Sequence, residues 1–189
     1  MQQNQTLDGY YKQLNSETRE HCERVAWLSK AVAEYVGLNE NLAFTIGLYH
    51  DVGKIYVPSR ILRKDSGLTS LEREIVDLHS YYGYGIIRET GMGPDIYIPV
   101  LYHHGFNKTK LSEIKEQVSM DNLRYIQIVH LVDIYDAMRA KRVYRDPCGK
   151  EEVINALLQD TLCNDIIIDF MQKGRGQSVI QTKIHNDVS

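Results

Sequence analysis

The apolar residues of this chain recur at helical intervals, and this periodicity limits the possible folds more than any other feature of the sequence. Within residues 17–36, for example, Val25, Leu28, Val32 and Tyr35 fall on one face of a helix. Only four prolines occur in 189 residues, so few positions interrupt a helix. The sequence therefore predicts an all-α fold.

Capping signals predict where the other helices begin and end. Thr69 and Glu72 have the spacing of a capping box, and Pro94 suits the first turn of a helix. We expect helices over 17–36, 39–50, from 69 through His79, 94–104 and 123–142, a loop over 53–67, and two short helices after residue 149. Because no repeat or long linker divides the chain, we expect a single domain over residues 1–189, with a core at about 17–170 and a short polar C-terminal tail.

Charge, hydropathy and cysteine content exclude several classes of protein. The formal charge of -3 offers no basic footprint for nucleic acid. No apolar run approaches the roughly 18 residues that span a bilayer, and the polar N-terminus is unlike a secretory signal. Cys22, Cys148 and Cys163 are far apart, which is typical of free thiols in a reducing compartment. We expect a cytoplasmic protein with no nucleic-acid or membrane partner.

Several acidic residues and histidines share the apolar faces of these helices. His21 lies one turn before Val25, and Glu17 lies one turn before His21, so the two can converge on one point. Asp133 follows Val129 by four residues. Because a buried carboxylate is costly unless it is paired or bound to a cation, this placement suggests a shared cation.

Two further histidines, His79 and His50, fit the same interpretation. His79 lies one turn after Ile75 and two turns after Leu71, which predicts that it points inward. The adjacent pair His50 and Asp51 supplies a nitrogen ligand and an oxygen ligand that can bridge two metals. Each histidine alone also fits a core imidazole bonded to the backbone. Together, the imidazoles and carboxylates favour iron, manganese, zinc or nickel over calcium or magnesium.

The segment His50-Asp51-Val52-Gly53-Lys54 resembles the signature of the HD superfamily of metal-dependent phosphohydrolases. The likeness extends to the HD-GYP subfamily, whose known members are cyclic di-GMP phosphodiesterases. It rests on Val57-Pro58, Ile61-Leu62 and Gly67-Leu68-Thr69, and on the late segment from Asp133 to Met138 with Arg142 and Tyr144-Arg145. The resemblance implies an HD-domain helical bundle.

The same resemblance implies a centre of two or three divalent metal ions, with iron or manganese expected. Asp51 would bridge two ions, and Glu17 matches the ligand of a third ion in trinuclear members, although Glu17 also fits a solvated residue at a helix N-terminus. The positions that match the family's ligands are Glu17, His21, His50, Asp51, His79, His103, His104 and Asp133.

Substrate contacts are implied at four further positions. Lys54 matches a lysine that contacts phosphate, and Arg142 fits either a second phosphate contact or an exposed helix-end residue. After His103-His104 the chain runs Gly105-Phe106-Asn107-Lys108-Thr109-Lys110, without the Gly-Tyr-Pro triplet that names the subfamily. We expect Lys108 and Lys110 to add positive charge at the substrate entrance.

The resemblance implies hydrolysis of a phosphodiester, in a cyclic dinucleotide similar to cyclic di-GMP, by a hydroxide that bridges the metals. Asp51 and Lys54 would be the catalytic residues. Two alternatives stay open: a nucleotidase or phosphatase that acts on a mononucleotide, and a non-catalytic metal-containing module that binds a nucleotide or docks a partner. The expected partner is a small nucleotide, with a homodimer or a signalling protein as further candidates.

Overall fold

The computed structural model describes residues 5–105, 117–140 and 146–173, and every regular element within these ranges is a helix. This confirms the predicted all-α fold. In chain order the elements are α1 (Leu7–Tyr11), α2 (Ser16–Tyr35), α3 (Glu40–Tyr49), the 3-10 helix η1 (Val52–Tyr56), α4 (Ser59–Leu62), α5 (Ser70–Asp77), α6 (His79–Glu89), α7 (Pro94–Tyr102), α8 (Met120–Arg139), α9 (Lys150–Leu158) and α10 (Asp165–Gln172).

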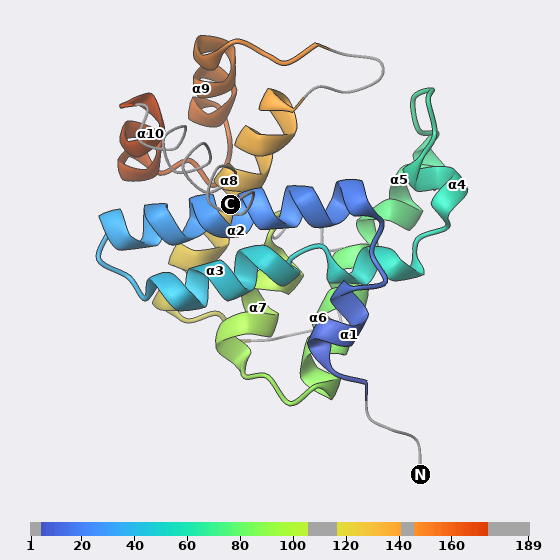
Figure 1. Cartoon of the computed structure of the whole chain (residues 1–189). Coiled ribbons are helices and arrows are strands. Elements are labelled where there is room, and N and C mark those ends of the chain that lie inside the picture. Colours follow the sequence, from blue (N-terminus) through green and yellow to red (C-terminus); the bar gives the residue numbers. More distant parts are fainter. Residues whose placement is uncertain (1–4, 106–116, 141–145, 174–189) are drawn as a thin grey trace, which may run out of the picture.

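Helix α2 runs through the middle of the molecule and packs against α3 and α8 (Figure 1). Asn15 caps its N-terminus by accepting a hydrogen bond from the Thr18 amide at 2.9 Å. Gly37, with a φ of 74°, follows its C-terminal end. Val25 and Leu28 are fully buried, as the helical periodicity predicted, and they join Val129 of α8 in the main core.

Short elements at the edge of the bundle differ from the prediction. The expected loop over 53–67 contains η1 and α4, and α1 was not expected. The helix expected from residue 69 through His79 is two helices that part at Leu78. The Thr69 capping box is present as predicted. None of the residues of α5 is buried, and Leu71 is 68% exposed. Leu71 therefore does not share a buried face with His79, and His79 is buried where α6 packs against η1.

Helices η1 and α6 approach each other closely at Gly53. A Cβ atom added to Gly53 would lie far inside van der Waals distance of the His79 carbonyl oxygen and the Gly83 backbone nitrogen. Only glycine fits this position without a backbone shift. The contact brings the residues just before η1, His50 and Asp51, against the first residue of α6.

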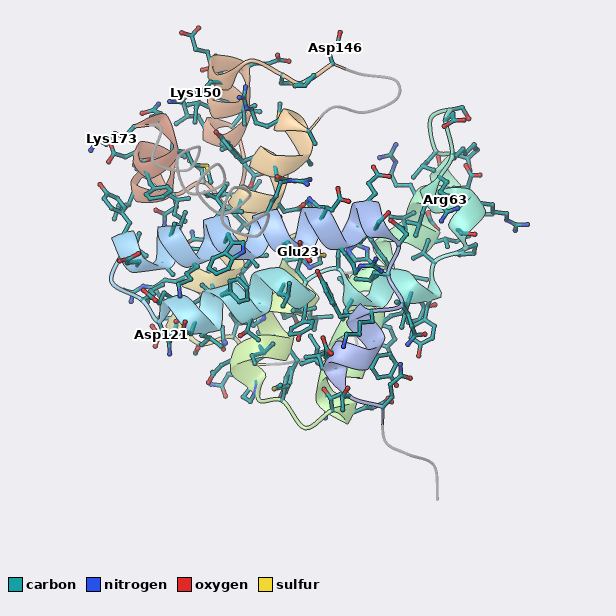
Figure 2. The ribbon with its side chains drawn as sticks, viewed as in Figure 1. Glu23, Arg63, Asp121, Asp146, Lys150 and Lys173 are labelled. Atoms are coloured by element: carbon teal, nitrogen blue, oxygen red, sulfur yellow. The ribbon has the colours of Figure 1, made fainter. Side chains whose placement is uncertain are left out.

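Helices α9 and α10 pack together on one side of the bundle, whereas α4 and α5 project from the opposite side (Figure 1). Figure 2 accordingly shows Lys173 and Arg63 at opposite sides of the molecule. Within the described ranges, no helix is long and apolar enough to span a bilayer.

Candidate metal centre

Seven of the eight predicted ligands converge in the interior, and they come from several helices that are distant in sequence. Three groups have potential ligand atoms within 4.8 Å of one another. They are His79 with His103 and His104, His21 with His50 and Asp133, and Cys22 with His50 and Asp51.

Asp51 lies between the two histidine groups. Its Oδ1 is 3.1 Å from Nε2 of His79, whereas its Oδ2 is 3.4 Å from Nε2 of His50 and 3.8 Å from Nε2 of His21. The two oxygens of one carboxylate thus face different groups of ligands. This position suits a bridge between two cations.

Three imidazoles are oriented by backbone carbonyls near the C-terminal ends of α3, α5 and α7. His50, His79 and His103 each donate Nδ1–H to the carbonyl oxygen three residues earlier, at 2.7, 2.5 and 2.6 Å respectively. Each Nε2 then carries a lone pair that faces the cluster. Nε2 of His79 lies 3.2 Å from Nε2 of both His103 and His104. Lone pairs this close repel one another unless a cation or a proton lies between them.

Two buried atoms of the cluster lack a hydrogen-bond donor within the described part of the chain. They are Nε2 of His50 and Oδ1 of Asp51, which lies 3.1 Å from the unprotonated Nε2 of His79. An unsatisfied buried polar group costs about 1–3 kcal/mol. A divalent cation would satisfy both atoms, and the mixed nitrogen and oxygen donors suit a transition metal. These residues therefore fit the predicted metals.

Burial keeps most of these imidazoles neutral. It lowers the pKa of His50 and of His103, and, together with the nearby His79, it lowers the pKa of His104 to about 3. Neutral imidazole is the form that binds metal. His21 differs: burial would lower its pKa, but hydrogen bonds with Asp133 and Asp136 outweigh burial and raise the pKa to about 9. A cation bound here would displace that proton.

Lys54 carries its charge at the edge of the same cluster. Its Nζ is 2.5 Å from Oδ2 of Asp51. Burial would lower the pKa of Lys54, but Asp51 outweighs burial and raises it. Burial would likewise raise the pKa of Asp51, but Lys54 and His50 hold it well below its usual value. Both groups are therefore charged at neutral pH.

A cleft of about 580 Å³ opens over the cluster. Its lining includes His21, Asp51, Lys54 and Asp133, together with Glu17. Glu17 is exposed and has no ion pair or hydrogen bond with the residues that the structure describes, so its role as a metal ligand remains a prediction. The other predicted substrate residues, Arg142, Lys108 and Lys110, lie outside the described residues.

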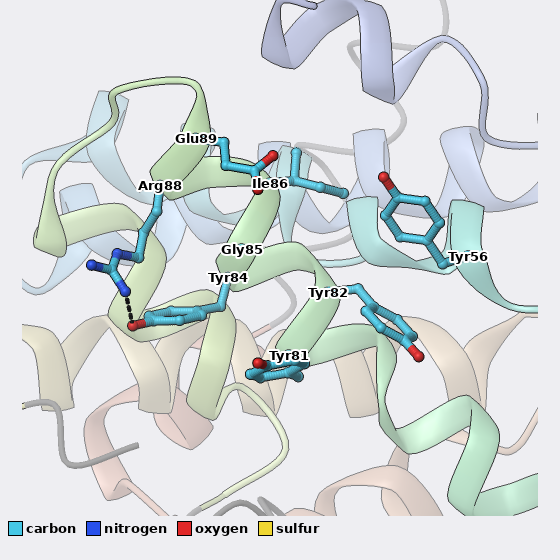
Figure 3. A pocket seen from close by; sticks show the side chains of 8 residues that line it. All are labelled: Tyr56, Tyr81, Tyr82, Tyr84, Gly85, Ile86, Arg88 and Glu89. Carbon is cyan, nitrogen blue, oxygen red and sulfur yellow. Dashed lines mark hydrogen bonds between the residues drawn. The ribbon is translucent and has the colours of Figure 1, made fainter. Parts of the chain in front are cut away.

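A second pocket, of about 550 Å³, runs along α6 and has different chemistry (Figure 3). Four tyrosines line it with Gly85, Ile86, Arg88 and Glu89. In Figure 3 the guanidinium of Arg88 donates a hydrogen bond to the hydroxyl of Tyr84, at 2.5 Å. None of the cluster residues lines this pocket. The two cavities are similar in size, so the ligand cluster alone identifies the candidate site.

Asp136 contacts a predicted metal ligand, His21, although no role was predicted for it from the sequence. Its Oδ2 accepts from Nδ1 of His21 at 2.7 Å, and Arg24 donates to both of its oxygens at 2.8 and 2.9 Å. Nε2 of His21 then faces Asp133 at 3.0 Å. A carboxylate that holds the second nitrogen of a histidine ligand fixes its orientation. The available signal was spacing, since Asp136 follows Asp133 by one helical turn.

We expect Asp136→Asn to weaken metal binding about 10–100-fold, the usual cost of losing such a support. Metal affinity of the purified chain, measured by competition with a chelator, checks this. Asp121→Asn is the matched control, because Asp121 lies on the same helix and is exposed. In Figure 2 it also lies far from Arg63, which lines the cleft. Equal affinity in both variants would show that His21 does not need Asp136.

A family model for the HD domain matches residues 18–138. A cyclic di-GMP phosphodiesterase of Thermotoga maritima is 34% identical over 157 aligned residues, and the match covers 75% of this chain and 39% of that protein. A 3'3'-cGAMP-specific phosphodiesterase 2 of Vibrio cholerae is 30% identical over 149 aligned residues, and the match covers 75% of this chain and 28% of that protein. This chain thus spans well under half the length of these two relatives.

The fold has a counterpart among solved structures. The HD domain of the L. monocytogenes phosphodiesterase PgpH, in complex with cyclic-di-AMP, is 20% identical, with a TM-score of 0.58, and the alignment covers 95% of this chain and 94% of that one. The helical bundle, the clustered histidine and aspartate ligands, and the family match agree with the resemblance predicted from the sequence. The chain belongs to the HD domain family.

Proposed function

We propose that this chain is a metal-dependent phosphodiesterase that hydrolyses a cyclic dinucleotide. The observation that carries the proposal is the position of Asp51, with one carboxylate between two groups of ligand atoms and Lys54 beside it. The substrates named for the relatives from Thermotoga maritima and Vibrio cholerae support the choice of a cyclic dinucleotide.

Divalent cations held by this cluster would supply Lewis acidity and activate water for attack at phosphorus. His50, His79 and His103 keep their Nε2 atoms aimed inward through their backbone hydrogen bonds. Lys54 retains its proton because Asp51 raises its pKa, so it acts as a fixed positive charge toward phosphate oxygens rather than as a base. The reaction therefore needs no nucleophilic side chain.

The number and identity of the ions are part of the same proposal. The two histidine groups that face Asp51 support two ions, and Glu17, which lines the cleft with His21, supports a third. The mixed donors favour iron, manganese, zinc or nickel, and the resemblance to the HD superfamily supports iron or manganese among these. A homodimer, a signalling partner and a cytoplasmic location remain predictions.

Turnover of a substrate panel tests the function. We expect the chain loaded with manganese, or with iron under anaerobic conditions, to contain two or three ions and to hydrolyse cyclic di-GMP and a generic aryl phosphodiester. Chelation should abolish both activities. Hydrolysis of mononucleotides alone would replace the proposal with a nucleotidase. Binding of cyclic di-GMP without turnover in any metal would establish a binding module.

A further inference from the structure

One wall of the cleft is formed by α4, α5 and the turn between them, and it carries none of the predicted metal ligands. Residues 61–68 line the cleft, followed by Arg73 and Val76, which lie one turn apart on the same side of α5. In Figure 1 this wall projects beyond the rest of the bundle, next to the N-terminal end of α2. It therefore faces the metal cluster across the opening of the cleft.

Hydrogen bonds join the turn between α4 and α5 to the first residues of α5. Lys64 pairs with Glu72 at 2.5 Å. Glu72 also accepts from the Thr69 amide at 2.8 Å, as part of the capping box of α5. Both interactions join the turn to α5. The charge of Lys64 is thus neutralised by Glu72, and its role is to hold the wall together.

Arg63 and Arg73 differ from Lys64 in having no such partner. Both guanidinium groups are exposed and line the cleft, and neither has a hydrogen bond or ion pair with the residues that the structure describes. Asp65 is the one carboxylate among the cleft-lining residues of this wall, and it too is exposed. With Glu72 paired to Lys64, the wall presents two guanidinium groups and one carboxylate toward an incoming ligand.

We propose that Arg63 and Arg73 form an anion subsite that binds the second phosphate of a cyclic dinucleotide while the first lies at the metal cluster. This inference rests on the proposed function. It explains how the site would prefer a substrate with two phosphates over one with a single phosphate. Guanidinium groups bind phosphate through paired hydrogen bonds. The cleft volume of about 580 Å³ is within the range of about 300–1,000 Å³ usual for small-molecule sites.

Steady-state kinetics of the manganese-loaded chain test the subsite with two substrates, cyclic di-GMP and bis(p-nitrophenyl) phosphate, which has a single phosphate. The double variant Arg63→Ala with Arg73→Ala should raise KM for cyclic di-GMP about tenfold, with a much smaller change in kcat. KM for the aryl diester should rise far less, since it has no second phosphate. Arg63→Lys with Arg73→Lys should recover part of the loss, because the charge remains while the paired geometry is lost.

Arg60→Ala is the matched control, because Arg60 is an exposed arginine of α4 that does not line the cleft. An equal rise of KM for both substrates, or the same effect from Arg60→Ala, would overturn the subsite. Equilibrium binding of cyclic di-GMP provides a readout that needs no turnover. If the wild type binds but does not hydrolyse, the proposed function fails, while weaker binding by the double variant still supports the subsite. If the wild type does neither, both proposals are wrong.

Discussion

Asp51→Asn should lower turnover of cyclic di-GMP by about 10³-fold or more, which corresponds to about 4 kcal/mol of transition-state stabilisation. The substitution keeps the shape of the side chain but removes the negative charge that faces both groups of imidazoles. It also removes the partner of Lys54. We expect the metal content to fall as well, since one neutral amide cannot replace a carboxylate that serves two cations. Activity and metal content are measured on the same preparation.

Asp146→Asn is the control for this change, because Asp146 is exposed, belongs to none of the ligand groups, and lies at the edge of the molecule in Figure 2. Thermal unfolding separates loss of chemistry from loss of structure. If Asp51→Asn stays folded and retains wild-type turnover, the chemistry takes place elsewhere and the proposed site is wrong.

Gly53→Ala should reduce the free energy of unfolding by at least about 3 kcal/mol, at the upper end of the usual cost of overpacking. The added methyl group would meet backbone atoms of His79 and Gly83, which cannot rotate away as a flexible side chain can. Helices η1 and α6 would have to separate. Because Asp51 and His79 lie on opposite sides of this contact, metal affinity should fall together with stability. Urea unfolding with and without chelator measures both effects.

Gly85→Ala provides a matched comparison within α6. A Cβ at Gly85 meets no other atom within 4 Å, and alanine in a helix is about 1 kcal/mol more favourable than glycine. The two glycine-to-alanine changes should therefore act in opposite directions. A stabilising effect of Gly53→Ala would mean that η1 and α6 do not pack as described.

The sequence was sufficient to predict most of the ligand cluster because helical periodicity and a specific motif agreed at His21 and Asp133. His21 and Asp133 face inward and are mostly buried, with 14% and 15% of their side chains exposed, as their spacing from Val25 and Val129 predicted. For His79 the two sources differed: the motif placed it correctly, whereas the spacing from Leu71 described a helix face that is exposed. Periodicity shows which residues share a face, but not whether that face meets the core.

Other features depend on contacts between distant segments, which no local pattern contains. Asp136 holds His21, which is 115 residues away in the sequence. Helix α1 has only five residues, which are too few to show a helical pattern of apolar residues. The division between α5 and α6 at Leu78 lacks both glycine and proline. Gly53 packs against the backbone of His79, where α6 begins, and the sequence alone does not reveal that contact.

Each ligand of the described cluster lies within a helix or within two residues of a helix end. Insertions and deletions in the connecting segments, such as the turn from Lys64 to Leu68, can therefore change the cleft wall without displacing the ligand atoms. Connections at the surface tolerate changes of length better than packed helices do. In such an architecture, the substrate specificity of the cleft can change while the metal ligands keep their positions. An engineered exchange of the α4–α5 turn is accordingly a route to a new substrate on an intact metal centre.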